Sequence, residues 1–429
     1  MAPSLANVAA ALAALKAERF DESLLAAAMK DVRVTLERAA GALCAGLEGE
    51  ETVRTRHVWM LSVAGWLRVA FPYAPRKATG RAAVALLCGA EQGAKGLPKA
   101  TPAARELVAR AGASMGSFAM ARDFLEDCCR VCASTETERR IALEAGRRTA
   151  EARAAGPLPP EPRRKPPLPD GALDVPPTLV LGADGSCFAC RKPDVAGRRG
   201  RNGGEAKGRN ANVMAACRYA HVGKNGKPVP EGGIRYGATG SGGERLGEEL
   251  WRMAVQEGVL DKSLRVVFVS DGERELEEVF QTHFAAIPGV VRVLDAMHAC
   301  QYVDTVAKTL EPDPDKAAKS SRRLRRRLSK SGWNAFLASF HAIFGNNAES
   351  RLHGDSLKAW KYLESRKAMM DYGNLRRRHI PIGSGMLECG CKLVIGSRLK
   401  GPGMHWRFNN GILIAALRAA LRSHLLICA

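Results

Sequence analysis

Leu264-Arg265-Val266-Val267-Phe268-Val269-Ser270-Asp271-Gly272 is the stretch that decides the fold. A short apolar run that is rich in β-branched residues and closed by Asp-Gly predicts a buried strand. Helical patterns flank it, over residues 243–257 before the run and 273–284 after it. A strand between two helices predicts the parallel part of a sheet.

Further strands are predicted on both sides of this unit. Those upstream follow one another directly, whereas the one downstream leads into a helix. Strands first, and then strands alternating with helices, predict an α/β fold with a mixed sheet. The additional predicted strands cover residues 178–183, 186–191, 213–221, 234–239 and 290–294.

Three acids follow the predicted strands or open a helix. Asp184 ends the strand at 178–183, Asp271 ends the strand quoted first, and Glu388 follows Gly383-Ser384-Gly385, where a helix is expected to begin. Open α/β sheets place their sites at the carboxyl ends of strands. We therefore expect neighbouring strands to bring Asp184 and Asp271 side by side, and a helix packed across that edge to add Glu388.

Three converging carboxylates repel one another unless cations bind between them. Hard oxygen ligands favour Mg²⁺ or Mn²⁺. Two such ions, ~3.5–4 Å apart, can activate an attacking oxygen and stabilise the leaving oxygen of a phosphodiester. Asp-Gly is also a turn signal, so each acid alone is weak evidence. The predicted site is a pair of Mg²⁺ or Mn²⁺ ions held by the three acids together.

The charge of the chain points to a polyanionic partner. Its 429 residues carry a net charge of +21, with a pI of about 9.8. The length predicts two to four domains, and the basic surface favours nucleic acid, with an anionic membrane surface as the competitor. No signal-peptide pattern and no spanning apolar stretch are visible, so we expect a cytoplasmic or nucleoid-associated protein without a membrane segment.

The twelve cysteines do not form a clear zinc motif. Cys129/Cys132 and Cys187/Cys190 each have the two-residue gap of a zinc half-site, but neither has a second half at zinc-finger spacing. We expect buried, reduced thiols at these positions.

Composition divides the chain into six predicted segments. A proline-rich stretch forms the clearest boundary, because proline at that density excludes regular helix and strand. The segments are a mainly helical region over 1–115 with a strand pair near 52–71, a helix-turn-helix-like DNA-binding segment over 116–153, a linker over 154–177, the first part of the core over 178–300, a basic helical insertion over 301–375, and C-terminal core helices over 376–429.

Two helices carry candidate phosphate contacts. The second helix of the 116–153 segment presents Arg139, Arg140 and Arg147 as a basic face, although an ordinary exposed charged helix fits the pattern as well. Residues 316–330 hold eight Lys and Arg in fifteen positions. In a chain already this basic, that run predicts phosphate contact, with a solvated face as the alternative. Its candidate residues are Arg322, Arg323 and Arg326.

The chain resembles DDE-class insertion-sequence transposases with an RNase H-like core, most closely the ISKra-type family. The resemblance covers most of the chain and rests on three blocks. They are Val269-Ser270-Asp271-Gly272 through Val293-Leu294-Asp295-Ala296-Met297-His298-Ala299; Ile382-Gly383-Ser384-Gly385 with Glu388, Cys391-Lys392, Arg398-Leu399-Lys400, Gly403-Met404 and Trp406; and residues 97–146 with Gly116-Ser117-Phe118.

The resemblance implies a metal triad of Asp184, Asp271 and Glu388. Asp295 and His298 match a D-x-x-H signature of such transposases, which gives His298 the expected role of orienting a phosphate or another ligand; a histidine that only packs on its helix is the alternative. Lys392, Arg398 and Lys400 follow Glu388 and are expected to contact phosphate.

The implied function is a transposase. It binds terminal inverted repeats in double-stranded DNA, cuts the ends with Mg²⁺ and joins the freed 3′-hydroxyl to target DNA, as a dimer or larger assembly when two ends are held together. Two alternatives stay open: a catalytically diverged, transposase-derived DNA-binding regulator, and a structure-selective nuclease with the same core.

Overall fold

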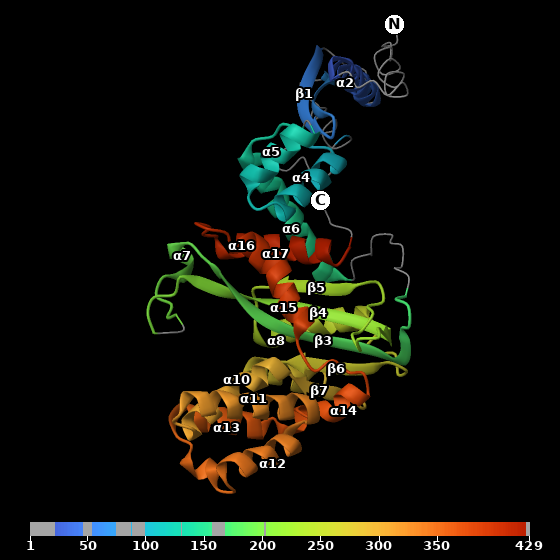
Figure 1. Ribbon diagram of the computed structural model, residues 1–429. Helices are drawn as coiled ribbons and strands as arrows, with labels where there is room; N and C mark the ends of the chain where they lie inside the picture. The colour runs from blue at the N-terminus through green and yellow to red at the C-terminus, as the bar shows by residue number, and fades with distance from the viewer. Residues whose placement is uncertain are drawn as a thin grey trace. The chain divides into compact units, whose positions relative to one another are not determined.

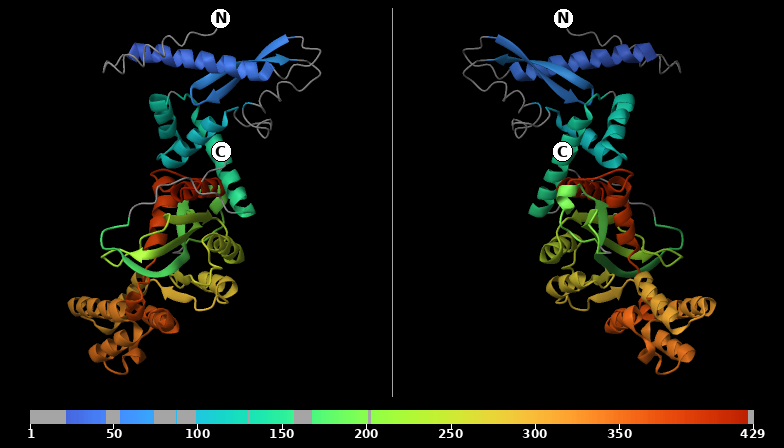
Figure 2. Two further views of the ribbon diagram at one scale, coloured as in Figure 1. Left: turned by 90° about the vertical axis from the view of Figure 1, so that its right-hand side faces the viewer. Right: turned by 90° about the vertical axis from the view of Figure 1, so that its left-hand side faces the viewer.

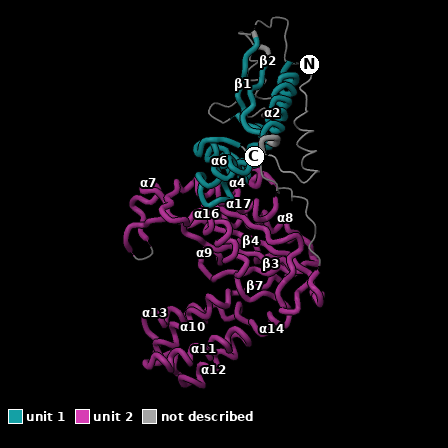
Figure 3. The backbone as a smooth tube through the Cα atoms, turned by 45° about the horizontal axis from the view of Figure 1, so that its top comes forward, with its two compact units in different colours: residues 1–151, 427–429 teal, residues 152–426 magenta. Residues whose placement is uncertain are grey.

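The computed structural model describes residues 22–45, 54–73, 87, 99–129, 131–156, 168–200 and 203–425. The chain divides into two compact units, residues 1–151 with 427–429 and residues 152–426 (Figure 3). The division falls within one helix, and each unit is described separately below.

In the described part of the first unit, a helix packs on a two-stranded hairpin. Helix α2 (Glu22–Ala45) covers one face of β1 (Arg54–Ser62) and β2 (Gly65–Tyr73), which pair antiparallel. This hairpin is the strand pair that the sequence predicts near 52–71. Alternate residues of the two strands make the core of the hairpin with Cys44 of α2: Val58, Met60, Leu67, Val69 and Phe71.

Three further helices follow over residues 102–155. They are α4 (Pro102–Ser114), α5 (Phe118–Cys129) and α6 (Thr135–Ala155). The Ser134 hydroxyl accepts a hydrogen bond from the Thr137 amide at 3.2 Å, which satisfies a free amide in the first turn of α6. Helices α5 and α6 therefore lie where the helix-turn-helix-like pattern predicts them.

The predicted linker over 154–177 is wrong at both ends. Helix α6 continues to Ala155, and strand β3 already begins at Leu173; residues 157–167 lie outside the described part. Strand β3 tolerates the prolines at 176 and 177 because they are not paired with either neighbouring strand. The β3–β4 register shifts between Asp174 and Thr178, and pairing of β3 with β6 starts only at Thr178. Proline has no amide hydrogen to donate, so neither ladder loses a hydrogen bond there.

The second unit is built on a mixed sheet of five strands, which confirms the predicted α/β class. The strand order is β5-β4-β3-β6-β7; β3, β4 and β5 pair antiparallel, whereas β6 and β7 run parallel to β3. The strands are β3 (Leu173–Ala189), β4 (Gly208–Val222), β5 (Ile234–Thr239), β6 (Arg265–Ser270) and β7 (Val291–Leu294).

Strand β3 does not end at Asp184, and the predicted return strand over 186–191 is wrong. Instead β3 runs unbroken to Ala189, and β4 pairs with it from Val222 back to Gly208. A Cβ atom on Gly208 would lie 2.4 Å from the Phe188 carbonyl oxygen, so this end of the ribbon requires glycine. After β3, short helix α7 (Lys192–Val195) leads into the β3–β4 connection.

Helices cover both faces of the sheet (Figures 1 and 2). On one face, α8 (Gly243–Gln256) and α9 (Arg274–His283) pack on Leu179, Leu181 and Phe268. On the other face, α10 (Ala296–Leu310) packs on Val267 and Val269. Because side chains alternate along a strand, odd-numbered residues of β3 face α8 and α9, and even-numbered ones face the opposite side.

The helical segment beside β6 and β7 follows β7 directly and so begins at Ala296 rather than at 301 (Figure 1). After α10 it comprises α11 (Pro314–Ser331), α12 (Trp333–Phe344), η2 (Ala348–Arg351), α13 (Gly354–Ser365), η3 (Lys367–Met369) and α14 (Tyr372–Arg377). Its core is a cluster of rings from Trp333, Phe336, Phe340 and Trp360.

The C-terminal helices return to the sheet. They are α15 (Gly385–Gly390), the π-helical segment η4 (Cys391–Gly396), α16 (Ser397–Leu399) and α17 (Phe408–Arg422). Two glycines permit α15 to lie close to the sheet. A Cβ on Gly182 would lie 2.2 Å from the Val269 carbonyl oxygen and 3.1 Å from Leu387 of α15, and one on Gly390 would lie 2.8 Å from the Tyr236 ring.

No helix within the described residues is long and apolar enough to cross a membrane.

Candidate active site

Asp184 and Asp271 lie at the same level of two adjacent parallel strands. The β3–β6 register pairs Thr178 with Arg265 and Leu181 with Phe268. If the same register is continued along both strands, Asp184 lies opposite Asp271. Side chains at one level of paired strands point to the same face of the sheet. The predicted proximity of the two aspartates therefore follows from the register, although Asp184 lies within its strand and only Asp271 follows the end of one.

Helix α15 brings Glu388 to the same face. Leu387 and Gly390, on either side of it, approach Gly182 of β3 and Tyr236 of β5. Burial is the main cause that raises the pKa of the Asp184 carboxyl; the negative charge of Asp271 is the next cause, and Glu388 also contributes. The carboxylates of all three predicted residues are thus close enough to interact electrostatically.

Glu273 is a fourth acid close to this group, and it was not predicted as a site residue. The Asp271 carboxylate raises the pKa of Glu273, and burial and Asp184 raise it further, whereas His298 lowers it. The amide of Glu273 also donates a 3.0 Å hydrogen bond to Asp271 Oδ1. Its position two residues after Asp271 was the available signal.

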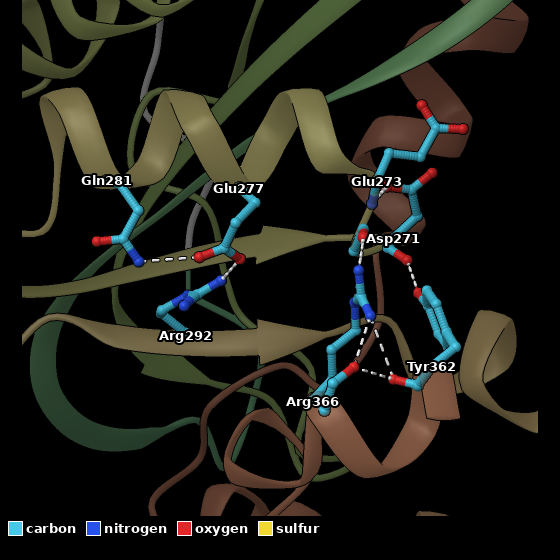
Figure 4. A network of polar contacts seen from close by, with 9 residues as sticks. Asp271, Glu273, Glu277, Gln281, Arg292, Tyr362 and Arg366 are labelled. Carbon is cyan, nitrogen blue, oxygen red and sulfur yellow. Dashed lines mark hydrogen bonds and ion pairs between the residues drawn. The ribbon is translucent and has the colours of Figure 1, made fainter. Parts of the chain in front are cut away.

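The backbone at Asp271 is held from α13 (Figure 4). The Tyr362 hydroxyl donates to the Asp271 carbonyl oxygen, and Arg366 donates to the Gly272 carbonyl oxygen from Nε at 3.1 Å and Nη2 at 2.6 Å. Gly272 has a positive φ of 80°, which favours glycine. The turn that carries Asp271 is therefore fixed by two side chains of the helical segment.

Asp295 joins the start of α10 to the loop before Glu388. Its Oδ1 atom accepts from the His298 amide at 2.6 Å and caps α10. Its Oδ2 atom accepts from the amide of Ser384 at 2.6 Å and from the Ser384 hydroxyl at 2.7 Å. Asp295 is buried, so these contacts are shielded from water.

The His298 ring lies against two tyrosines. Its centroid is 5.4 Å from that of Tyr302 and 6.4 Å from that of Tyr362, and the two tyrosine rings stack at 4.0 Å. The influence of His298 on the pKa of Glu273 places the imidazole near the acids. His298 is half-buried.

Cys391 contacts Asp184 directly. Its Sγ atom lies 3.7 Å from Asp184 Oδ2 and 3.9 Å from the Asp184 carbonyl oxygen. Burial, and then the Asp184 carboxylate, raise the pKa of the Cys391 thiol to about 12. The thiol is therefore protonated at neutral pH and acts as a weak donor to Asp184.

Two of the predicted basic residues after Glu388 are near the acids. Lys392 Nζ lies 3.8 Å from Glu388 Oε2, and both side chains are exposed. The charge of Lys400 acts on Cys391, so Lys400 is also close to this group, and its side chain is exposed.

The prediction for Arg398 is wrong, because its side chain is only 1% exposed and cannot reach a phosphate. The guanidinium lies 5.0 Å above the Trp406 ring, and Nη1 lies 3.9 Å from the Met404 sulfur. Arg398 is thus part of the packing that also holds Trp406.

The π-helical segment after Glu388 is bound by a buried arginine of α17. Arg418 Nε donates to the carbonyl oxygens of Leu393 at 3.1 Å and Val394 at 3.0 Å, and Nη2 donates to Leu393 and to the Ser397 hydroxyl. A π-helix offsets the usual ladder of an α-helix, and such segments are frequent at functional sites. The planar guanidinium provides several donors for the displaced carbonyls.

The arginines of α6, in the first unit, are paired with glutamates of the same helix. Arg139 Nη2 lies 2.6 Å from Glu136, and Arg147 binds both Glu144 at 2.7 Å and Glu151 at 2.6 Å. Arg140 and Arg147 are exposed, and Arg140 forms no ion pair with another described residue. The basic face predicted for α6 is therefore largely neutralised within the helix.

The predicted arginines of α11, unlike Arg139 and Arg147 of α6, are not paired with acids of their own helix. Arg322, Arg323 and Arg326 are all exposed, and their face of α11 lies opposite the buried Leu324 and Leu328. The neighbouring Arg325 is bound to Asp304 at 3.2 Å. A pocket of about 530 Å³ lies between α10 and α11, and it is lined by none of the four acids described above.

The carboxylate oxygens of these acids are suitable ligands for a divalent cation, but the side chains do not converge on a single position. Among the described residues, no three His, Cys, Asp or Glu side chains are close enough together to hold a metal ion. The donor set is nevertheless hard oxygen. Burial, and then the negative charge of Asp271, raise the pKa of Asp184, and a bound cation would offset that repulsion.

The cysteine pairs differ from the expected buried thiols. Cys132 and Cys187 are exposed, whereas Cys190 is buried and Cys129 is half-buried.

No protein-family model matches the chain, and no curated protein matches it.

Proposed function

We propose that this chain is a transposase that binds terminal inverted repeats and catalyses Mg²⁺-dependent cleavage and strand transfer of DNA ends. One observation carries the proposal: Asp184 and Asp271 share one level of adjacent parallel strands, and α15 packs Glu388 onto the same face. The pKa of Asp184, raised in part by the other two acids, supports their convergence.

The strand order supports an RNase H-like core as part of this proposal. Three antiparallel strands are followed by two strands parallel to the first, and the acids lie on the first strand and directly after the fourth. That arrangement is what an RNase H-like core with a DDE triad is expected to have. The helices α11 to α14 would then be the insertion that precedes the loop leading to Glu388.

The proposed roles follow from the contacts. When bound, two Mg²⁺ or Mn²⁺ ions would activate the attacking oxygen and stabilise the leaving oxygen. Asp184, Asp271 and Glu388 would hold them, and Cys391 keeps the Asp184 carboxylate in place through its thiol. Lys392 and Lys400, which are both exposed, would contact a phosphate, and His298 would orient a phosphate near Glu273.

The net charge of +21 supports duplex DNA, both terminal repeats and target, as the partner. Arg140 of α6 and Arg322, Arg323 and Arg326 of α11 are the proposed phosphate contacts that are exposed and form no ion pair with a described residue. Holding two ends together requires at least a dimer, and such a protein would be associated with the nucleoid.

The test is a cleavage and joining assay on a duplex taken from the DNA that flanks the gene. Asp184→Asn and Glu388→Gln should bind the duplex as the wild type does and lose cleavage and joining. Glu278→Gln, which changes an exposed acid on α9, is the matched control and should retain both activities. Cleavage by Asp184→Asn in Mg²⁺ would contradict the assignment. Binding without cleavage by the wild type would favour the regulator, and cleavage without joining would favour the nuclease.

A further inference from the structure

Helix α11 has one apolar face and one basic face. Its buried side is formed by Ala317, Ser321, Leu324 and Leu328. At 100° per residue, five exposed basic side chains fall within the opposite side of the helix. They are Lys319, Arg322, Arg323, Arg326 and Lys330.

Exposed arginines also occur at α14, which contacts the end of α11. Arg376 Nε donates to the Ser329 carbonyl oxygen at 3.0 Å, which ties α14 to the last turn of α11. Arg377 and Arg378 follow and are exposed. From there the chain passes within a few residues into the Ser384 loop that Asp295 holds before Glu388.

No acid lies among residues 316–331 or 372–379. Like charges three or four residues apart destabilise a helix, and α11 has several such pairs, for example Arg322 with Arg326. Helix α6 also carries five arginines, but three of them, Arg139, Arg147 and Arg148, are paired with glutamates of the same helix at these spacings. The unneutralised α11 face therefore indicates a partner that brings the negative charge.

We propose that these residues, together called the α11–α14 surface (Lys319, Arg322, Arg323, Arg326, Lys330, Arg377 and Arg378), bind the backbone of duplex DNA next to the scissile phosphate. Rising about 1.5 Å per residue, the 18 residues of α11 span roughly 27 Å, or about eight base pairs. The inference rests on the proposed function for the site's identity, but the surface itself binds without catalysis.

The experiment measures binding of a fluorescent 30-base-pair duplex from the flanking DNA to the full chain, in EDTA, over a salt series. Arg377→Glu/Arg378→Glu should raise Kd at least about tenfold and flatten the plot of log K against log salt by about 2. Lys224→Glu/Lys227→Glu makes the same charge change at exposed lysines of the β4–β5 connection, and it should change Kd less than about threefold.

Duplex length supplies a second measurement. Shortening the DNA on one side of the cleavage position should weaken wild-type binding until about eight base pairs are lost, and the Arg377/Arg378 variant should not respond to this shortening. Equal effects of the two double variants, or tighter binding to an RNA duplex of the same sequence, would overturn the proposal. EDTA removes the metal ions, so these measurements report binding alone. Loss of the cleavage activity would not change the predicted binding, and a failed binding prediction would not change the predicted cleavage.

Discussion

Asp295 Oδ2 lies 2.6 Å from the Ser384 amide and 2.7 Å from the Ser384 hydroxyl, across 89 residues of sequence. The same carboxylate caps α10 through its other oxygen. The D-x-x-H pattern thus has a structural role here, because its aspartate positions the loop that precedes Glu388. Asp295 is not itself placed among the three proposed metal ligands.

Breaking this contact should loosen the start of α15. Asp295→Ala and Ser384→Ala should each destabilise the fold, by about 1–3 kcal/mol for the buried carboxylate and about 1 kcal/mol for the serine. Because the two residues share one contact, the double variant should cost less than the sum. Urea unfolding of the four proteins measures this, and strictly additive free energies would contradict the contact.

Arg418 should hold the π-helical segment. Arg418→Met removes the donors to Leu393 and Val394, and it should increase hydrogen–deuterium exchange over residues 391–399 by about tenfold or more, since an unmet buried carbonyl costs about 1–3 kcal/mol. Arg418→Lys keeps a cation and should restore part of the protection.

The matched control for this prediction is Arg422→Met, on the exposed end of the same helix. It should leave exchange over 391–399 unchanged. Equal exchange in wild type and Arg418→Met would show that the segment does not depend on the guanidinium.

Glu138 should make the first unit sensitive to pH. This α6 side chain is buried, and neither carboxylate oxygen has a hydrogen-bond partner among the described residues. Burial raises the pKa of Glu138 to about 7. Since the folded pKa lies above that of the unfolded chain, the folded unit binds more protons, and its stability falls as pH rises from about 4.5 to about 7.

Glu138→Gln removes this dependence. The variant should gain on the order of 1–3 kcal/mol over wild type at pH 8 and much less at pH 4.5. Thermal unfolding followed by circular dichroism at the two pH values measures the difference. A gain that is the same at both would contradict an ionisable cause.

Much of the sheet could be predicted from the sequence, because apolar runs such as Val266–Val269 and helical periods identify buried elements locally. The β5 bounds, 234–239, agree with the structure to the residue. The unbroken β3 was missed because Asp184-Gly185 is a turn signal in most sequences. Here fourteen paired residues of β4 override that signal.

The site was predicted in part. Strand order could bring Asp184 and Asp271 together, but the level at which they meet depends on register, which sequence does not give. Burial of Arg398 and the role of Arg418 depend on how α15, η4 and α17 pack. No local pattern distinguishes these arginines from exposed ones such as Arg422.

The central claim is that Asp184, Asp271 and Glu388 together hold the catalytic cations. Calorimetric titration of the full chain with Mn²⁺ tests it most directly. We predict about two ions per chain for wild type and for Glu278→Gln, and loss of this binding in Asp184→Asn, Asp271→Asn and Glu388→Gln. Unchanged Mn²⁺ binding in Asp184→Asn, or no binding by wild type in the presence of the flanking duplex, would contradict the account.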